Sequence, residues 1–181
     1  MINKIILMKT STKQILVILK VFAWIIFIGL CIITGAIILS FIISLFNSEA
    51  AANLYLGQDL SGVYASGVWE YVLINSFLIG IAGLKAYMFY LVVQLFTAIN
   101  LEQPFSQSVG ALLLKLSRVA LGIGILAFIF NGYAKWLYKA GIPFDYDGSS
   151  TEFLFLAGIV FVIAQIFKRG LELQNENELT V

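Results

Sequence analysis

The chain has 181 residues, of which 61% are hydrophobic and only 12% are charged, and its formal net charge is +1. Soluble globular domains carry about 25% charged residues, so this composition excludes an ordinary soluble protein and predicts one that lives in a lipid bilayer. The sequence contains no histidine, which excludes histidine metal sites, histidine-based catalytic triads and imidazole pH switches.

Four apolar runs follow one another, and each predicts a transmembrane helix. A helix needs roughly 20 residues to cross a hydrocarbon core about 30 Å thick, and the first three runs meet this length easily. The fourth is shorter, but Ser150 or Thr151 offers a helix cap at its start, and Lys168 and Arg169 end it. The sequence therefore predicts one all-α membrane domain over residues 1–181, with spans at about 21–46, 68–90, 118–138 and 150–168.

Lysine and arginine predict the orientation, because positively charged flanks stay on the cytoplasmic side. With both chain ends inside, the outer side holds only Lys135 and Lys139, whereas the inner side holds Lys4, Lys9, Lys13, Lys20, Lys115, Arg118, Lys168 and Arg169. We therefore expect a multi-pass protein of the cytoplasmic (inner) membrane. Its outer loops are 47–67 and 139–149, its inner connection is 100–118 and its cytoplasmic tail is 169–181.

The first run follows a basic segment, residues 1–20, which serves either as a topology signal or as an amphipathic lead-in on the inner leaflet. The run itself is much longer than the roughly 7 to 15 apolar residues of a signal peptide. The length of the outer loop after it allows some packed structure, and its apolar residues are as well suited to dipping into the membrane interface as to binding anything; they are Leu54, Tyr55, Leu56, Val63 and Tyr64. We see no site in this loop.

The second run, residues 68–99, would be about 48 Å long as a helix and exceeds the hydrocarbon core. Its inner end needs a cover, which the segment after the inner connection offers: Val109, Leu112, Leu113 and Leu116 recur on one helical face. With Pro104 stopping one helix and Ser106 capping the next, the second and third helices would extend into a cytoplasmic hairpin. Alternatively, residues 109–116 lie flat among the headgroups.

Lys85 interrupts the second run, and two interpretations of it stay open. Counted from Trp69 as an outer-belt residue, Lys85 lies about 6 Å short of the inner boundary. Its ammonium group would then snorkel into the headgroups. The functional alternative is an ion-coupling or proton-relay group within the membrane.

Asn75 and Asn131 lie roughly 8 Å below the outer belt on antiparallel helices, counted from Trp69 and Trp136. A hydrogen bond between these amides would stabilise helix packing by about 0.6 kcal/mol. The alternative is a polar substrate site at this depth.

The second outer loop begins like a calcium-binding loop at Asp145 and Asp147 but does not continue like one. An EF-hand needs glycine at position 6 and glutamate at position 12, where this chain has Ser150 and Leu156. We predict neither a metal nor a cofactor. An acid pair, or a nucleophile beside a base, is also not visible, so we do not expect an enzyme.

After Lys168 and Arg169 a helical continuation to about Gln174 is expected, followed by a polar segment and an apolar end. The last residues and the inner connection carry recognisable motifs: Gln103-Pro104-Phe105-Ser106, and Gly170 followed by Glu176, Asn177, Leu179, Thr180 and Val181. In this combination the chain resembles the bacterial membrane family catalogued as domain of unknown function 2975, over nearly its whole length.

The resemblance implies a four-span membrane protein without assigned activity. It also implies a cytoplasmic partner, because members of that family appear to be encoded beside a small helix-turn-helix regulator. We therefore hypothesise a membrane-bound regulatory partner that binds such a regulator and does not itself bind nucleic acid. Its candidate partner-binding residues are Pro104, Phe105, Gly170, Glu176, Asn177, Leu179, Thr180 and Val181. The alternative is a small-solute transporter or channel subunit that uses Lys85, Asn75 and Asn131. Homo-oligomers are compatible with either role.

Overall fold

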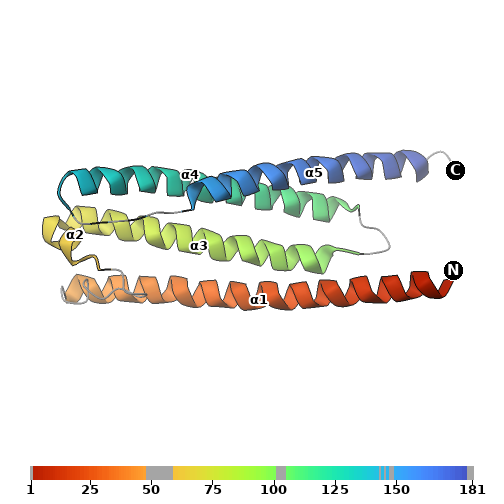
Figure 1. Ribbon diagram of the computed structural model, residues 1–181, viewed down its shortest axis with the longest axis horizontal. Coiled ribbons are helices and arrows are strands. Elements are labelled where there is room, and N and C mark those ends of the chain that lie inside the picture. Colours follow the sequence, from red (N-terminus) through yellow and green to blue (C-terminus); the bar gives the residue numbers. More distant parts are fainter. Residues whose placement is uncertain are drawn as a thin grey trace.

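The computed structural model describes residues 2–47, 59–100, 105–142, 144, 146 and 149–178. Five helices make up its regular structure, and no strand occurs in these ranges, which confirms the predicted all-α fold (Figure 1). The helices are α1 (Ile2–Phe46), α2 (Ser61–Ser66), α3 (Val68–Ala98), α4 (Gln107–Lys139) and α5 (Ser150–Glu178).

Four of the helices are long and apolar enough to cross a membrane, as the composition predicted. The candidate spans are Lys13–Phe46, Val68–Ala98, Gln107–Lys139 and Ser150–Gln174. Each predicted span falls inside one of them. The helices are longer than the predicted spans, and α4 begins at Gln107, well before the predicted start of the third span at 118. The fold is that of a multi-pass membrane protein.

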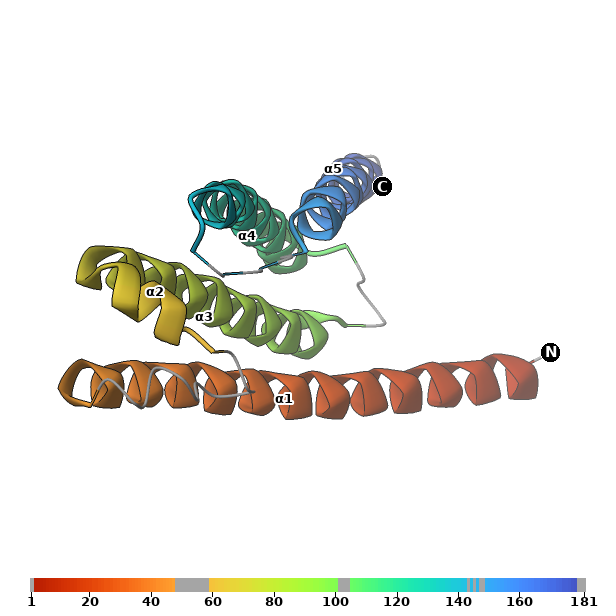
Figure 2. The same cartoon turned by 60° about the vertical axis from the view of Figure 1, so that its left-hand side comes forward.

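The long helices form an open row in which each is antiparallel to the next along the chain. Backbone neighbours are α1 with α3, α3 with α4, and α4 with α5, whereas no such contact joins α1 to α4 or α5 within the described ranges. Figure 2 shows α1 running along the edge of this row. The chain ends, the end of α3 and the start of α4 lie at one end of the molecule, here called the terminal end (Figure 1). The opposite end, with α2 and the end of α4, is the loop end.

The hydrophobic core lies between α3, α4 and α5. Its largest fully buried side chains include Tyr71, Ile74, Ile123, Phe130 and Leu137. By contrast, the buried side chains of α1 within the described part of the chain are Ala23 and Ser44. Most apolar side chains of α1 are exposed, which is the expected state of a helix whose other sides face lipid.

The hairpin of α3 and α4 agrees with the predicted amphipathic face. Val109, Leu113 and Leu116 are buried, and Leu112 packs against them at the edge of the core. Ser106 caps α4 as predicted, because its side-chain oxygen accepts a hydrogen bond of 3.3 Å from the backbone nitrogen of Val109.

The loop after α1 contains a short helix, α2, that the sequence did not predict. Val63 is completely buried, and the ring of Tyr64 packs edge-on against Tyr71 with 5.0 Å between centroids. These two residues therefore belong to structure packed against α3, which the length of the loop allowed. A single helical turn is too short to show a periodic pattern. Leu54, Tyr55 and Leu56 lie outside the described residues.

The last helix is displaced along α4 toward the terminal end. At the loop end its first residue, Ser150, lies beside Asn131, eight residues, or about 12 Å, before α4 ends at Lys139. At the terminal end Gly170 lies beside Phe105, so that residues 171–178 of α5 continue past the start of α4 (Figure 1). This displacement creates one recess at the loop end and one free helix end at the terminal end.

Candidate functional site

Two of the motif residues touch each other at the terminal end. A Cβ atom added at Gly170 would lie 2.6 Å from Cε1 and 2.7 Å from Cδ1 of Phe105, so the ring occupies the space that any other side chain would need. The same ring packs against Phe167, with 5.2 Å between the ring centroids. The inner connection is thereby fixed to α5.

The capping of α4 explains why Phe105 takes this place. Ser106 is the N-cap residue and has an extended backbone, so the residue before it projects away from the helix axis toward α5. Pro104, the neighbouring motif residue, lies outside the described residues. Sequence reasoning identified Phe105 and Gly170 as motif positions, but not their contact.

A groove lies next to this contact, between α4 and α5. Its volume is 460 Å³, within the range of ligand and peptide sites. Apolar and small residues line most of it, and polar side chains border it. The lining residues are Ser106, Gln107, Gly110, Ala111, Leu114, Ala164, Phe167, Lys168, Leu171 and Glu172.

Two of the remaining motif residues, Glu176 and Asn177, belong to the free end of α5. Glu176 is exposed on the helix, and the backbone of Asn177 is helical, because α5 runs to Glu178 and not only to the predicted Gln174. Arg169 and Glu172 form an ion pair of 2.9 Å on the surface of the same helix. Leu179, Thr180 and Val181 lie outside the described residues.

Lys85 lies between α3 and α5. Its Nζ atom sits 5.3 Å from the centroid of the Phe153 ring, in the first turn of α5. Such a cation–π contact stabilises a charge that is partly withdrawn from water. Both interpretations of this lysine, headgroup anchor and functional group, stay open.

Asn75 and Asn131 do not form the predicted hydrogen bond. Asn75 is buried and donates to the carbonyl of Tyr71 at 2.9 Å, whereas Asn131 donates to the hydroxyl of Ser150 at 3.3 Å. Equal depth in the membrane therefore did not bring the two amides together, because the rotation of each helix about its axis turns them toward different neighbours. In the described part of the chain, Oδ1 of Asn75 receives no hydrogen bond.

A polar contact that sequence reasoning missed joins α1 to α3. The hydroxyl of Tyr71 donates to Oγ of Ser44 at 2.5 Å, and both groups are buried. Oγ of Ser44 in turn donates to the carbonyl of Phe41 at 2.7 Å. Ser44, a polar residue within the first apolar run, was a sequence signal for a buried hydrogen bond. The run alone did not indicate that Tyr71 is its partner.

As for metal binding, no group of three or more His, Cys, Asp or Glu side chains gathers among residues that the structure describes.

Asp59, outside the spans, accepts a 2.8 Å hydrogen bond from the backbone nitrogen of Ser61. Its hydrogen bonds with the side chain and backbone of Ser61 lower the pKa of its carboxyl group. The backbone bond, from a residue two positions further on, forms an Asx-turn just before α2.

Comparison with known proteins gives one match. The model of a family described as "Protein of unknown function (DUF2975)" matches residues 55–181, which include α2, α3, α4 and α5. No curated protein and no solved structure matches the chain.

Proposed function

Because the chain belongs to the DUF2975 family of proteins of unknown function, as its motifs predicted, we propose a role that joins its own geometry with the cytoplasmic regulator that the family resemblance implies. The protein is a membrane-bound regulatory partner. Its terminal end faces the cytoplasm and holds a small helix-turn-helix transcription regulator, which binds DNA in its place.

The observation that carries this proposal is the contact of Phe105 with Gly170. It joins Phe105, just before α4, to α5. The groove that Gly110, Leu114 and Leu171 line lies next to this contact, since the neighbouring residues Ser106 and Phe167 also line it. An apolar groove with polar edges suits the apolar face of an amphipathic helix. The free end of α5 lies directly beside it and offers further contact surface.

The distribution of charge supports a cytoplasmic terminal end. Lys13 and Lys20 of α1 and Lys168 and Arg169 of α5 lie toward that end of their helices, and positively charged flanks stay inside. The α3–α4 hairpin then reaches the cytoplasmic surface with its connection.

Cysteine labelling tests this orientation. In a Cys31→Ser background, single cysteines replace Ser106 at the terminal end or Ser149 at the loop end. A membrane-impermeant thiol reagent applied to intact cells should label the second and not the first. The reverse pattern would overturn the assignment of the terminal end to the cytoplasm.

Co-purification tests the partner. The probe is a small helix-turn-helix regulator of the kind that the family resemblance implies, and the bait is the full chain in detergent. Gly110→Leu fills the groove without a clash, because an added Cβ at Gly110 meets nothing within 4 Å. Gly122→Leu is the matched control on the same helix, also with nothing within 4 Å and away from the groove.

We expect Gly110→Leu and removal of residues 171–181 each to reduce recovery of the regulator about thirtyfold, because interface anchors contribute about 2 kcal/mol or more. Gly122→Leu should recover as much as the wild type. Equal recovery from all four proteins would refute the role of the groove and the tail.

One observation favours the alternative, a small-solute transporter or channel subunit. The ammonium group of Lys85 lies between two helices, over the ring of Phe153, and intramembrane charges commonly mark solute or ion pathways. In this case Lys85→Met abolishes flux in reconstituted vesicles. Unchanged flux would leave Lys85 as a headgroup anchor.

A further inference from the structure

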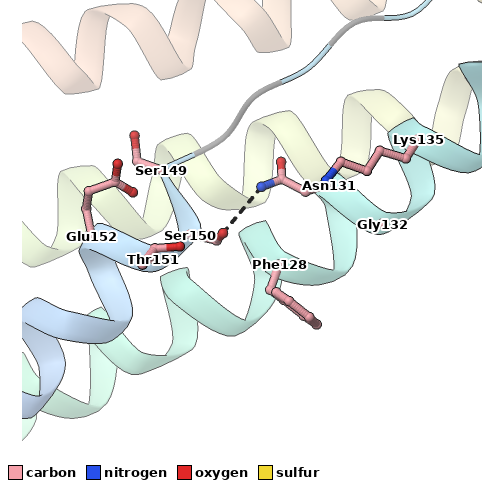
Figure 3. Close-up of a pocket in the computed structure, with 8 residues that line it drawn as sticks. All are labelled: Phe128, Asn131, Gly132, Lys135, Ser149, Ser150, Thr151 and Glu152. Atoms are coloured by element: carbon pink, nitrogen blue, oxygen red, sulfur yellow. Dashed lines mark hydrogen bonds between the residues drawn. The ribbon is translucent and has the colours of Figure 1, made fainter.

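The displacement of α5 leaves a recess on the flank of α4 near the loop end, lined by both helices (Figure 3). Its volume is 510 Å³, enough for a small ligand or a lipid headgroup. Six polar residues line it: Asn131, Lys135, Ser149, Ser150, Thr151 and Glu152. Gly132 and Phe128 complete the lining.

The recess has an ordered polar floor. Ser150 is 8% exposed, and its Oγ accepts the hydrogen bond of 3.3 Å from Nδ2 of Asn131. Figure 3 shows this bond near the middle of the recess, with Lys135 toward one side and Glu152 toward the other. The hydrogen bond fixes α5 against α4 and so holds the two charged side chains apart.

The two charges are not paired with each other. No ion pair joins Lys135 to Glu152, nor either of them to another side chain, within the described ranges. Isolated charges near the hydrocarbon region are unfavourable unless they find a partner. A ligand with an anionic group and a cationic group would satisfy both at once.

We propose that this recess binds a zwitterion that carries a primary ammonium group and a phosphate or carboxylate. The anionic group pairs with Lys135, and the ammonium donates hydrogen bonds to Glu152, beside which the hydroxyl groups of Ser149 and Thr151 lie (Figure 3). A quaternary ammonium has no N–H to donate, so it binds less well. Charge-assisted hydrogen bonds at both ends supply the affinity and the selectivity.

Two sources supply this chemistry: the headgroup of phosphatidylethanolamine, and a free zwitterion such as an amino acid. Phe128 borders the recess and is 67% exposed, which offers an apolar surface to an acyl chain beside the headgroup. The proposal does not depend on which side of the membrane the loop end faces.

The test uses the full chain in nanodiscs that contain equal parts of phosphatidylethanolamine and phosphatidylcholine. After extraction into detergent, mass spectrometry measures the retained lipids. In a second arm, protein in detergent without lipid is titrated with glycerophosphoethanolamine and with a panel of amino acids, and binding is followed by calorimetry.

Three variants and one control remove single features of the recess. Lys135→Gln and Glu152→Gln remove the charges. Gly132→Leu fills the recess, since an added Cβ at Gly132 meets nothing within 4 Å. Gly122→Leu, which also meets nothing, is the control outside it.

We expect retention of phosphatidylethanolamine over phosphatidylcholine, or binding of a free zwitterion. Each of the three variants should lose about tenfold in affinity, because a hydrogen bond to a charged group is removed or blocked. Preference in the lipid arm identifies the headgroup, and binding of amino acids alone identifies a free zwitterion. Equal retention of both lipids without zwitterion binding, or three variants that all bind like Gly122→Leu, would overturn the proposal.

Discussion

Gly170→Ala should destabilise the protein although alanine is the better helix former. The added Cβ would lie 2.6 Å and 2.7 Å from two ring carbons of Phe105, about 1 Å closer than the favourable separation of carbon atoms. The ring cannot simply retreat, because it also packs against Phe167. Overpacking costs about 1–3 kcal/mol, and the gain in helix propensity offsets up to about 1 kcal/mol, so we expect a net loss of about 1–2 kcal/mol.

The assay is reversible unfolding in mixed micelles of a mild detergent and sodium dodecyl sulfate, followed by tryptophan fluorescence. Gly158→Ala is the control in the same helix, where an added Cβ meets nothing within 4 Å, and it should be neutral or stabilising. In a Phe105→Ala background the cost of Gly170→Ala should vanish, because the ring is gone. An unchanged cost in that background would refute the proposed contact, since coupled residues show an interaction energy of about 0.5–3 kcal/mol.

Further predictions concern the other close contacts. Gly124→Ala should cost about 1–3 kcal/mol in the same unfolding assay. The added Cβ would lie 2.7 Å from Cγ of Leu154 and 3.0 Å from the backbone nitrogen of Leu154. Full rescue by Leu154→Ala would contradict the backbone contact. Tyr71→Phe should lose about 0.6 kcal/mol through its hydrogen bond to Ser44, and no further loss should follow when Ser44→Ala is added. Burial raises the pKa of the Tyr146 phenol above its ordinary value of 10.0. The contribution of the buried neutral phenol to the stability of the fold is therefore fully present below that pH and is lost as pH rises through the raised pKa. The phenolate absorbance of Tyr146, measured as the difference between the wild type and Tyr146→Phe, should appear with a midpoint above pH 10.0. A midpoint at or below that value would argue against burial of this phenol.

The four long helices and the start of α4 were predictable because they depend on local signals, although the helices extend beyond the predicted spans. Long apolar runs specify spans, Ser106 specifies the start of α4, and the spacing of Val109, Leu113 and Leu116 specifies its buried face. The motif positions also sufficed to identify the family.

Features that depend on how helices turn and slide against each other were not predictable. Depth counted along a sequence placed Asn75 and Asn131 together, but the rotation of α3 and α4 separates their partners. The displacement of α5 is set by close packing of Leu154 on Gly124 and of Phe105 on Gly170. Such contacts join residues far apart in the chain and leave no periodic signal.

Two aromatic residues of the loop after α4 pack into the core, where the sequence predicted only an outer loop. The rings of Phe144 and Tyr146 lie 5.9 Å and 4.3 Å from the ring of Phe130. Because aromatic residues are common both in membrane-facing loops and in cores, composition alone did not distinguish the two.

The open row bears on how the protein is made. Its backbone contacts join only neighbouring helices along the described chain, so that each newly synthesised long helix can pack on the one inserted just before it. Assembly of this kind avoids long-range pairing, which slows folding. Within the described ranges the backbone of α1 contacts that of α3 and of no other helix, and the matched family region begins at residue 55. We therefore expect a chain started before α2 to insert and pack α3, α4 and α5 without the first helix. Biogenesis of the core would then depend on the last three spans, and α1 would join as a separate step.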